Sequence, residues 1–272
     1  MKKGMYEIEA ETPDPAFREC WNAAGQHLQS CFNRHRQPCE YGQYAAWLKS
    51  SLSPPFLEHL SFRLGNQLFF IRVEPNSQTV SIPGTASGLQ TVADGQQGHA
   101  CLMPMNYDRE TWKPAYPDWG LIDCVTGASV IPPDLTTEDP VEITDWELHD
   151  FAVQTVRDCI AKEGHKIMSF CGNPSLDPSV WFVGDDGPEW VVVRAVRYPE
   201  KEAQIPSNWF AIAESCARLS SKGNFASVPV ANAEDPFDSD KPSTPIWRGH
   251  GMFVAYQGLI NSEAVERKAG NP

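Results

Sequence analysis

The stretch TDWELHDFAVQTVRDCIAKEG, residues 144–164, carries the clearest structural signal in the sequence. It begins with a Ser/Thr-x-x-Glu capping box, in which the side chains of Thr144 and Glu147 bond to the backbone of a helix's first turn. Apolar residues then recur at steps of three and four, as on the buried face of an amphipathic helix. Gly164 is suited to ending that helix. The sequence therefore predicts a helix that packs by one face on the rest of the protein.

The residues after this helix predict a sheet for it to cover. Apolar runs predict strands over residues 166–170, 180–183, 190–196, 225–230 and 251–256. The second and third of these runs flank Gly184-Asp185-Asp186-Gly187, which predicts a hairpin turn. A further helix is expected over residues 208–219, closed by Gly223, and the last dozen polar residues are expected to fray.

The first half of the chain has a similar pattern. Asp14 and Pro15 suit the N-cap and first position of a helix over residues 15–32. Two apolar runs around Gly65-Asn66 predict a hairpin. Further helices are expected over residues 41–52 and 88–97, strands over 99–105 and 120–125, and a Pro-rich linker over 132–140.

Both halves thus give the order helix, hairpin, helix, strand, long loop, strand. Residues 69–73 are similar to residues 191–195, and residues 98–105 to residues 224–230. We predict an α+β fold of two similar helix–hairpin–helix–strand modules, with helices packed on antiparallel or mixed sheets. The modules are expected over residues 15–135 and 141–260. An internal duplication would explain the pattern, and a chance rhythm is the alternative.

Composition narrows the function classes. The chain has 272 residues with 41% hydrophobic and 21% charged, which is typical of a globular protein and excludes a collagen or a coiled coil. Its net charge of −13 disfavours binding to a phosphate backbone. The sequence shows no signal peptide and no long apolar run, so no membrane partner is expected. Eight scattered cysteines favour reduced thiols and a cytoplasmic location.

The order of elements around Glu147, Asp177 and residues 193–196 resembles the PD-(D/E)XK nuclease-like fold. That fold uses two carboxylates to hold a divalent metal and a lysine to position water. Asp177 stands where the family's Asp would, but Arg194-Ala195-Val196 replaces its acid-x-Lys motif. The resemblance therefore implies a degenerate scaffold that lacks the catalytic motif. The helix–hairpin–helix–strand–strand order also looks like that of type III secretion chaperones, and this resemblance implies a protein partner.

Two arginines interrupt apolar strands at equivalent places in the two halves. A cation such as Arg72 or Arg194 among Phe, Ile and Val must reach a partner or the rim of the sheet. A solvent-facing position in the strand is one interpretation, and a pair of anion-holding groups is the other. We include Arg72, Arg194 and Asp177 among the candidate binding residues, together with His250, which lies between two glycines.

Aromatic residues in or beside loops are candidate protein-contact anchors. We single out Trp119 and Trp247 for this role. The alternative is that such large rings cap the ends of the sheets. Acidic pairs in the loops could face a basic partner.

A possible metal set is His27, Cys31, His35 and Cys39, spaced by four residues. Pro38 breaks the turn before Cys39, and Arg34 and Arg36 would repel a cation. We therefore predict no metal site and no cofactor.

These observations favour a non-catalytic, acidic, protein-binding protein of the bacterial cytosol with an inhibitor, immunity or chaperone-like role. The alternative is a metal-dependent hydrolase or nuclease with relocated ligands. Its carboxylates would come from Glu147, Asp177, Asp185, Asp186 and Glu189. A third possibility is a subunit that completes an assembly.

Overall fold

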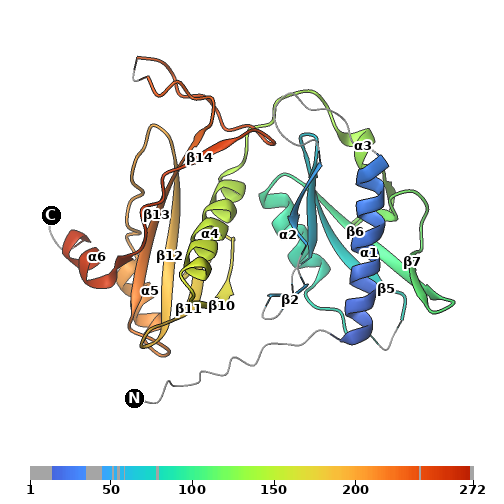
Figure 1. The fold of residues 1–272 in the computed structure, drawn as a ribbon, viewed down its shortest axis with the longest axis horizontal. Helices are drawn as coiled ribbons and strands as arrows, with labels where there is room; N and C mark the ends of the chain where they lie inside the picture. Colours follow the sequence, from blue (N-terminus) through green and yellow to red (C-terminus); the bar gives the residue numbers. More distant parts are fainter. Residues whose placement is uncertain are drawn as a thin grey trace. The chain divides into compact units, whose positions relative to one another are not determined.

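The computed structural model describes residues 14–34, 45–50, 52–53, 56–57, 59–77, 80–238 and 240–269. These residues form two compact units (Figure 1). The N-terminal unit extends to Ile143 and also includes Trp247–His250. The C-terminal unit contains Thr144–Ile246 and the chain from Gly251 onward. Both units combine helices with a mixed sheet, so the predicted α+β class is confirmed.

The N-terminal unit is built around one sheet. Its elements are α1 (Pro15–Arg34), β1 (Ala45–Lys49), β2 (Leu52–Ser53), β3 (Phe56–Leu57), β4 (Leu60–Leu64), β5 (Gln67–Pro75), α2 (Ala86–Gly95), β6 (His99–Asp108), β7 (Thr111–Pro114), β8 (Leu121–Asp123), β9 (Ser129–Val130) and α3 (Pro132–Leu135). The strand order is β1-β4-β5-β6-β8-β9, with β7 beside β6 and with β2 and β3 forming a separate pair. Because α2 connects β5 to β6, these two strands run parallel.

The central strand β5 is covered on both faces. Phe69, Ile71 and Val73 lie in the cluster that includes the buried side of α1. Leu68 and Phe70 lie in the cluster with the buried residues of α2. Alternate residues of a strand point to opposite faces, so the near-continuous apolar run of β5 follows from its position between two helices.

The C-terminal unit has a second mixed sheet. Its elements are α4 (Asp145–Lys162), β10 (Lys166–Phe170), β11 (Val180–Gly184), β12 (Gly187–Arg197), α5 (Trp209–Cys216), β13 (Gly223–Asn232), β14 (Met252–Val254), β15 (Ile260–Asn261) and α6 (Ser262–Ala269). The strand order is β10-β11-β12-β13-β14, and β15 also pairs with β13. Strands β12 and β13 are parallel and joined through α5. The rings of Trp190 on β12 and Trp209 on α5 meet in the core.

The structure confirms most predicted elements and corrects several. The segment predicted as a helix over 41–52 contains strands β1 and β2, and residues 41–44 and 51 lie outside the described residues. Trp47 of β1 packs against Phe32 and Phe62, so tertiary packing outweighs the local pattern. Among the C-terminal residues predicted to fray, 262–269 form α6, whose Val265 is fully buried, and residues 270–272 lie outside the described residues.

Two further boundaries differ from prediction. The predicted linker over 132–140 contains α3, and Asn66 of the β4–β5 turn bonds to Thr137 and to the Asp139 carbonyl. Gly223 begins β13 and does not close α5, which ends at Cys216. In addition, residues 247–250 belong to the N-terminal unit although the second module was predicted to run from 141 to 260.

Each unit follows the same order of main elements. In the N-terminal unit this order is α1, β1, β4, β5, α2, β6 and β8, and in the C-terminal unit it is α4, β10, β11, β12, α5, β13 and β14. In each case the helix between the third and fourth strands joins a parallel pair. Similarity of the two modules in detail, and an origin by duplication, remain predictions.

Candidate functional site

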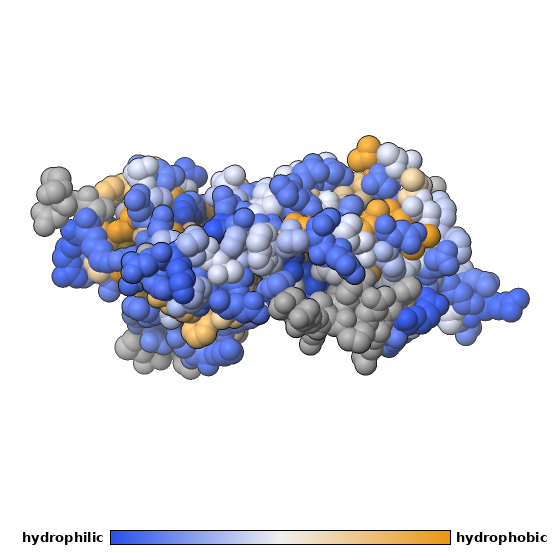
Figure 2. All heavy atoms as spheres, turned by 90° about the horizontal axis from the view of Figure 1, so that it is seen from above, coloured by the Kyte–Doolittle hydropathy of each residue, from blue (hydrophilic) through white to orange (hydrophobic). Residues whose placement is uncertain are grey.

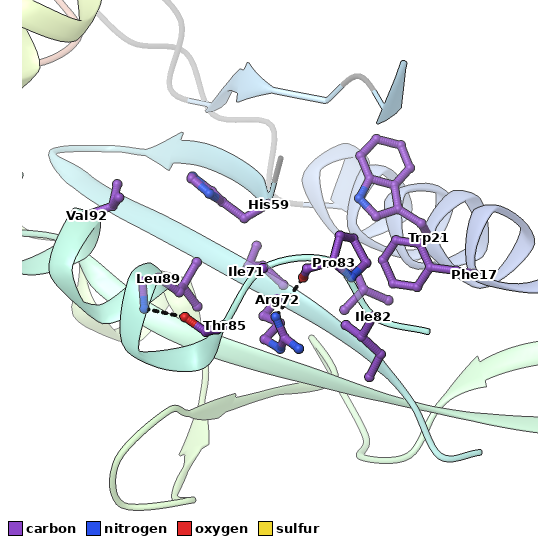
Figure 3. A pocket seen from close by; sticks show the side chains of 13 residues that line it. Phe17, Trp21, His59, Ile71, Arg72, Ile82, Pro83, Thr85, Leu89 and Val92 are labelled. Atoms are coloured by element: carbon purple, nitrogen blue, oxygen red, sulfur yellow. Dashed lines mark hydrogen bonds between the residues drawn. The ribbon is translucent and has the colours of Figure 1, made fainter. Parts of the chain in front are cut away.

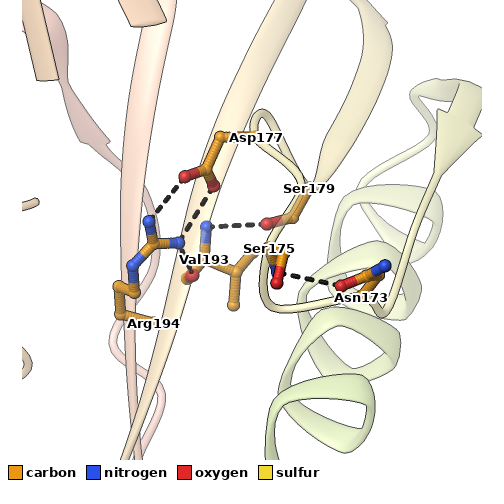
Figure 4. Close-up of polar contacts among 6 residues, drawn as sticks. All are labelled: Asn173, Ser175, Asp177, Ser179, Val193 and Arg194. Carbon is orange, nitrogen blue, oxygen red and sulfur yellow. Dashed lines mark hydrogen bonds and ion pairs between the residues drawn. The ribbon is translucent and has the colours of Figure 1, made fainter. Parts of the chain in front are cut away.

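Arg194 and Asp177 form a two-bond ion pair in the C-terminal unit (Figure 4). Arg194 Nη1 donates to Asp177 Oδ1 at 2.9 Å, and Nη2 donates to Oδ2 at 2.6 Å. The backbone N–H of Val193 donates to Ser179 Oγ at 3.3 Å. The segment from 173 to 179 is therefore tied to β12, and both carboxylate oxygens of Asp177 are engaged by the guanidinium.

His149 of α4 lies near this ion pair. Its side chain is buried, and its Nε2 atom has no hydrogen-bond partner among the described residues. Burial, followed by the positive charge of Arg194, lowers the pKa of His149 to about 4. Asp177 and Asp150 act in the opposite direction. The imidazole is therefore neutral at pH 7.

Arg72 has an analogous arrangement in the N-terminal unit. Its Nε donates to Glu74 Oε1 at 3.1 Å, and its Nη1 donates to the carbonyl of Pro83 at 2.8 Å. Arg72 and Arg194 are thus both partly buried and paired with a carboxylate of their own unit. A solvent-facing position in the strand and a role in holding an external anion both stay predictions.

The two predicted aromatic anchors are not equivalent. Trp119 is 3% exposed and packs against Phe32 and Phe62 in the N-terminal core. Its assignment as a surface anchor is wrong, because the ring fills space under the sheet. Trp247 is half-buried and forms a bridge with Glu142.

Arg248 lies between Trp247 and His250 and was missed by the sequence analysis. It is buried, and its guanidinium donates to the carbonyls of Asn66, Gln96 and Gln97. These carbonyls belong to the β4–β5 turn and to the end of α2. His250 follows in a turn in which its N–H donates to the Trp247 carbonyl. A charged residue inside a glycine-rich segment was the available signal.

The possible metal set cannot be assembled from the described residues. His27 Nε2 and Cys31 Sγ are 3.7 Å apart, but both lie against the Asp118 carbonyl. His35 and Cys39 lie outside the described residues. Within the described ranges, no group of three His, Cys, Asp or Glu side chains is placed to hold one metal ion.

Four of the five carboxylates named for the hydrolase alternative have structural partners. Glu147 completes the capping box of α4 by accepting from the Thr144 N–H at 2.9 Å. Asp186 pairs with Lys222 at 2.9 Å, and Glu189 accepts from Asn224 at 3.1 Å. Asp177 is paired as described above, and Asp185 is exposed in the β11–β12 turn.

The C-terminal unit contains a mostly apolar groove. It has a volume of about 260 Å³. Ten residues line it: Tyr198, Glu200, Lys201, Pro229, Val230, Ala231, Phe237, Phe253, Ala255 and Gln257. Because Ala231 of β13 pairs with Phe253 of β14, both side chains point to one face of the sheet. We call this site the aromatic groove.

Phe237 is held over the groove by a folded loop. Its backbone φ is +51°, a left-handed conformation that is unusual for a bulky residue. The buried carboxylate of Asp235 accepts from the N–H of Phe237 at 2.8 Å and from that of Thr244 at 2.6 Å. The Phe237 ring then contacts Tyr198 at 5.2 Å and Phe253 at 6.0 Å between centroids. The sequence analysis missed this cluster, because Phe237 is isolated in a polar, Pro-rich segment.

Two rings of the aromatic groove are open to solvent. Phe253 is 61% exposed and Phe237 is 49% exposed. Figure 2 shows a mostly hydrophilic surface on which hydrophobic residues form small, separate patches. The exposed rings of Phe237 and Phe253 are thus adjacent, and the buried Asp235 carboxylate positions the first of them.

Comparisons with known proteins add one family match. Residues 146–262, which run from the first turn of α4 to the start of α6, match a domain of unknown function (DUF8840). No curated protein and no solved structure matches the chain. Among the described residues, no helix is both long enough and apolar enough to span a bilayer.

Proposed function

We propose that this protein is a non-catalytic binding protein that holds an extended, apolar and basic segment of another protein in the aromatic groove. Such an activity is chaperone-like or inhibitory. The observation that carries the proposal is the set of rings of Tyr198, Phe237 and Phe253, which stand together on one sheet face and are partly open to solvent. Large aromatic rings of this kind are common anchors of protein interfaces.

The position of β14 supports an extended ligand. Among the described strands, β14 ends the order β10-β11-β12-β13-β14 and pairs only with β13. An extended peptide can add to such an edge through main-chain hydrogen bonds, while side-chain pockets next to the edge select the sequence. The aromatic groove lies beside this edge and would receive an apolar side chain of the ligand.

Charge supports a basic ligand. The whole chain has a formal net charge of −13 at pH 7. Residues 233–245, which present Phe237, contain Glu234, Asp235, Asp238 and Asp240 but only one lysine, Lys241. Acidic surroundings attract lysine- and arginine-rich segments and make their association dependent on salt.

Two further observations agree with this proposal. The helix–hairpin–helix–strand–strand order of the sequence resembles that of type III secretion chaperones, and this resemblance implies a protein partner. Glu147, Asp177, Asp186 and Glu189, four of the five carboxylates of the hydrolase alternative, are engaged in a helix cap, ion pairs and an amide contact. No feature of the described residues favours that alternative.

The proposal is tested by selecting peptides from a random 12-residue display library on the full chain. We expect the selected peptides to carry one or two bulky apolar residues and several Lys or Arg residues. Binding of these peptides should weaken roughly tenfold or more in Phe237→Ser and in Phe253→Ser, because each change removes one wall of the aromatic groove.

A matched control is Phe210→Ser. Phe210 is also an exposed phenylalanine of the C-terminal unit, on α5, and it does not line the groove. Its substitution should leave peptide affinity unchanged. The proposal is wrong if no peptide is enriched, or if the three variants bind the selected peptides as well as the wild type does.

A further inference from the structure

The N-terminal unit contains a cavity of about 230 Å³, separate from the aromatic groove (Figure 3). It is lined by Phe17 and Trp21 of α1, His59, Ile71, Arg72 and Val73 around β5, residues Ile82–Thr85, and Gly88, Leu89 and Val92 of α2. Most of this lining is apolar. The volume suits a small organic molecule, below the usual size of drug-like ligands.

The cavity arises where the sheet is incomplete. Strand β4 starts at Leu60, opposite Ile71, so β5 continues past it from Arg72 to Pro75. His59 and the segment from Ile82 to Thr85 border the space beside the extended part of β5. The cavity therefore results from the greater length of β5 relative to β4 and from the path of the β5–α2 connection.

Two polar side-chain atoms at this cavity have no hydrogen-bond partner within the part of the chain that the structure describes. The Trp21 side chain is 7% exposed, and its Nε1–H has no acceptor among the described residues. Figure 3 shows the indole nitrogen on the edge of the ring that faces the cavity. The Nε2 atom of His59 is also buried without a partner. A buried indole N–H normally finds an acceptor, and leaving it unpaired costs stability.

Positive charge lies in and near the cavity. Arg72 lies at one end, where it is fixed by Glu74 and the Pro83 carbonyl. The charge of Lys49 acts on His59, whose pKa falls to about 3 because of burial first and this lysine second. A neutral imidazole can present an N–H at Nε2. Thr85 caps the N-terminus of α2, which has positive dipole character.

We infer that this cavity binds a small organic carboxylate with an apolar body. The carboxylate would accept hydrogen bonds from Trp21 Nε1–H, His59 Nε2–H and Arg72, and the body would lie against Phe17, Ile71 and Leu89. An acceptor group satisfies the two orphaned atoms, and an apolar body fills a space that water would occupy poorly. This site is independent of the proposed protein-binding function.

The test uses the full chain labelled with ¹⁵N and three probes: benzoate, hexanoate and 3-phenylpropanoate. The chain has nine tryptophans, and the indole resonance of Trp21 is assigned from Trp21→Phe. We expect at least one probe to shift this resonance saturably. The primary amide of that probe, which is neutral, should bind roughly tenfold more weakly or worse.

Two variants and a matched control complete the test. Trp21→Phe keeps the apolar wall and should weaken probe binding roughly threefold to tenfold; because it lacks the reporting indole, its affinity is read from the backbone amide resonances of Ile71 and Leu89. Arg72→Gln should weaken probe binding roughly tenfold or more. Trp112→Phe removes another buried, unpartnered indole N–H of the same unit that does not line the cavity, so it should have no effect. If Arg72→Gln does not fold, Trp21→Phe and the amide comparison decide. The inference is overturned if no probe moves the Trp21 resonance, or if acid and amide bind equally.

Discussion

At the scale of single residues, each unit holds an arginine of a central strand in an ion pair with a carboxylate. The resemblance to a nuclease-like fold directed attention to Asp177 and to Arg194, and the two side chains form a two-bond ion pair. Two parallel hydrogen bonds between a guanidinium and a carboxylate fix the relative orientation of both groups. In this arrangement, Asp177 and Arg194 tie a loop to β12.

The buried His149 gives this region a pH dependence. Its pKa is about 4 in the folded protein and near 6.5 when unfolded, so below pH 6.5 the unfolded chain binds the extra proton. The contribution of neutral His149 to the free energy of unfolding is complete above pH 6.5. It is therefore lost as the pH falls toward 4. In His149→Gln, the slope of the free energy of unfolding over this range should decrease by up to about 1.4 kcal/mol per pH unit. Urea unfolding at several pH values measures this slope, and an unchanged slope would contradict the assignment.

At the scale of elements, the sequence predicted those helices and turns whose signals lie within a few neighbouring residues. The capping box at Thr144 and Glu147 and the Gly65-Asn66 hairpin are confirmed, because their signals lie within a few residues. Strand β1 and helix α6 were not predicted, because Trp47 and Val265 depend on packing partners far away in the sequence. The aromatic groove was missed for the same reason: Tyr198, Phe237 and Phe253 meet only in the folded unit.

The N-cap of helix α4 offers a direct test of the capping-box signal. Thr144 Oγ1 accepts from the Glu147 N–H at 3.1 Å. Thr144→Ala should lower the free energy of unfolding by about 1 kcal/mol, because an N-cap hydrogen bond is lost. Thr155→Ala in the same helix removes only a hydroxyl that bonds to the Phe151 carbonyl, so it should change stability by less than about 0.5 kcal/mol. Equal effects of the two substitutions in chemical denaturation would count against the capping role.

At the scale of the whole molecule, the two units are not consecutive pieces of chain. Residues 247–250 return to the N-terminal unit, and Arg248 binds carbonyls at the end of α2 and in the β4–β5 turn. A charged donor that reaches three buried carbonyls connects segments about 150 to 180 residues apart in the sequence. The N-terminal unit therefore includes a segment, residues 247–250, that lies near the C-terminal end of the sequence.

Arg248→Ala should destabilise the N-terminal unit by about 2 kcal/mol or more, because the carbonyls of Asn66, Gln96 and Gln97 lose a charged donor. Hydrogen exchange should become faster at residues 65–67 and 95–98. Arg157→Ala is the control, because Arg157 pairs at the surface with its neighbour Asp158. If exchange at the two segments is the same in Arg248→Ala and the wild type, the segment 247–250 has no such role.

The central claim is that an extended peptide docks at β14 beside the aromatic groove. Hydrogen exchange of the full chain, with and without a peptide selected on it, tests this claim most directly. We predict slower exchange at Met252–Val254 on peptide binding, and loss of this protection in Phe253→Ser or when alternate amides of the peptide are N-methylated. Peptide binding that leaves exchange at Met252–Val254 unchanged, or that protects only residues elsewhere, would contradict the claim.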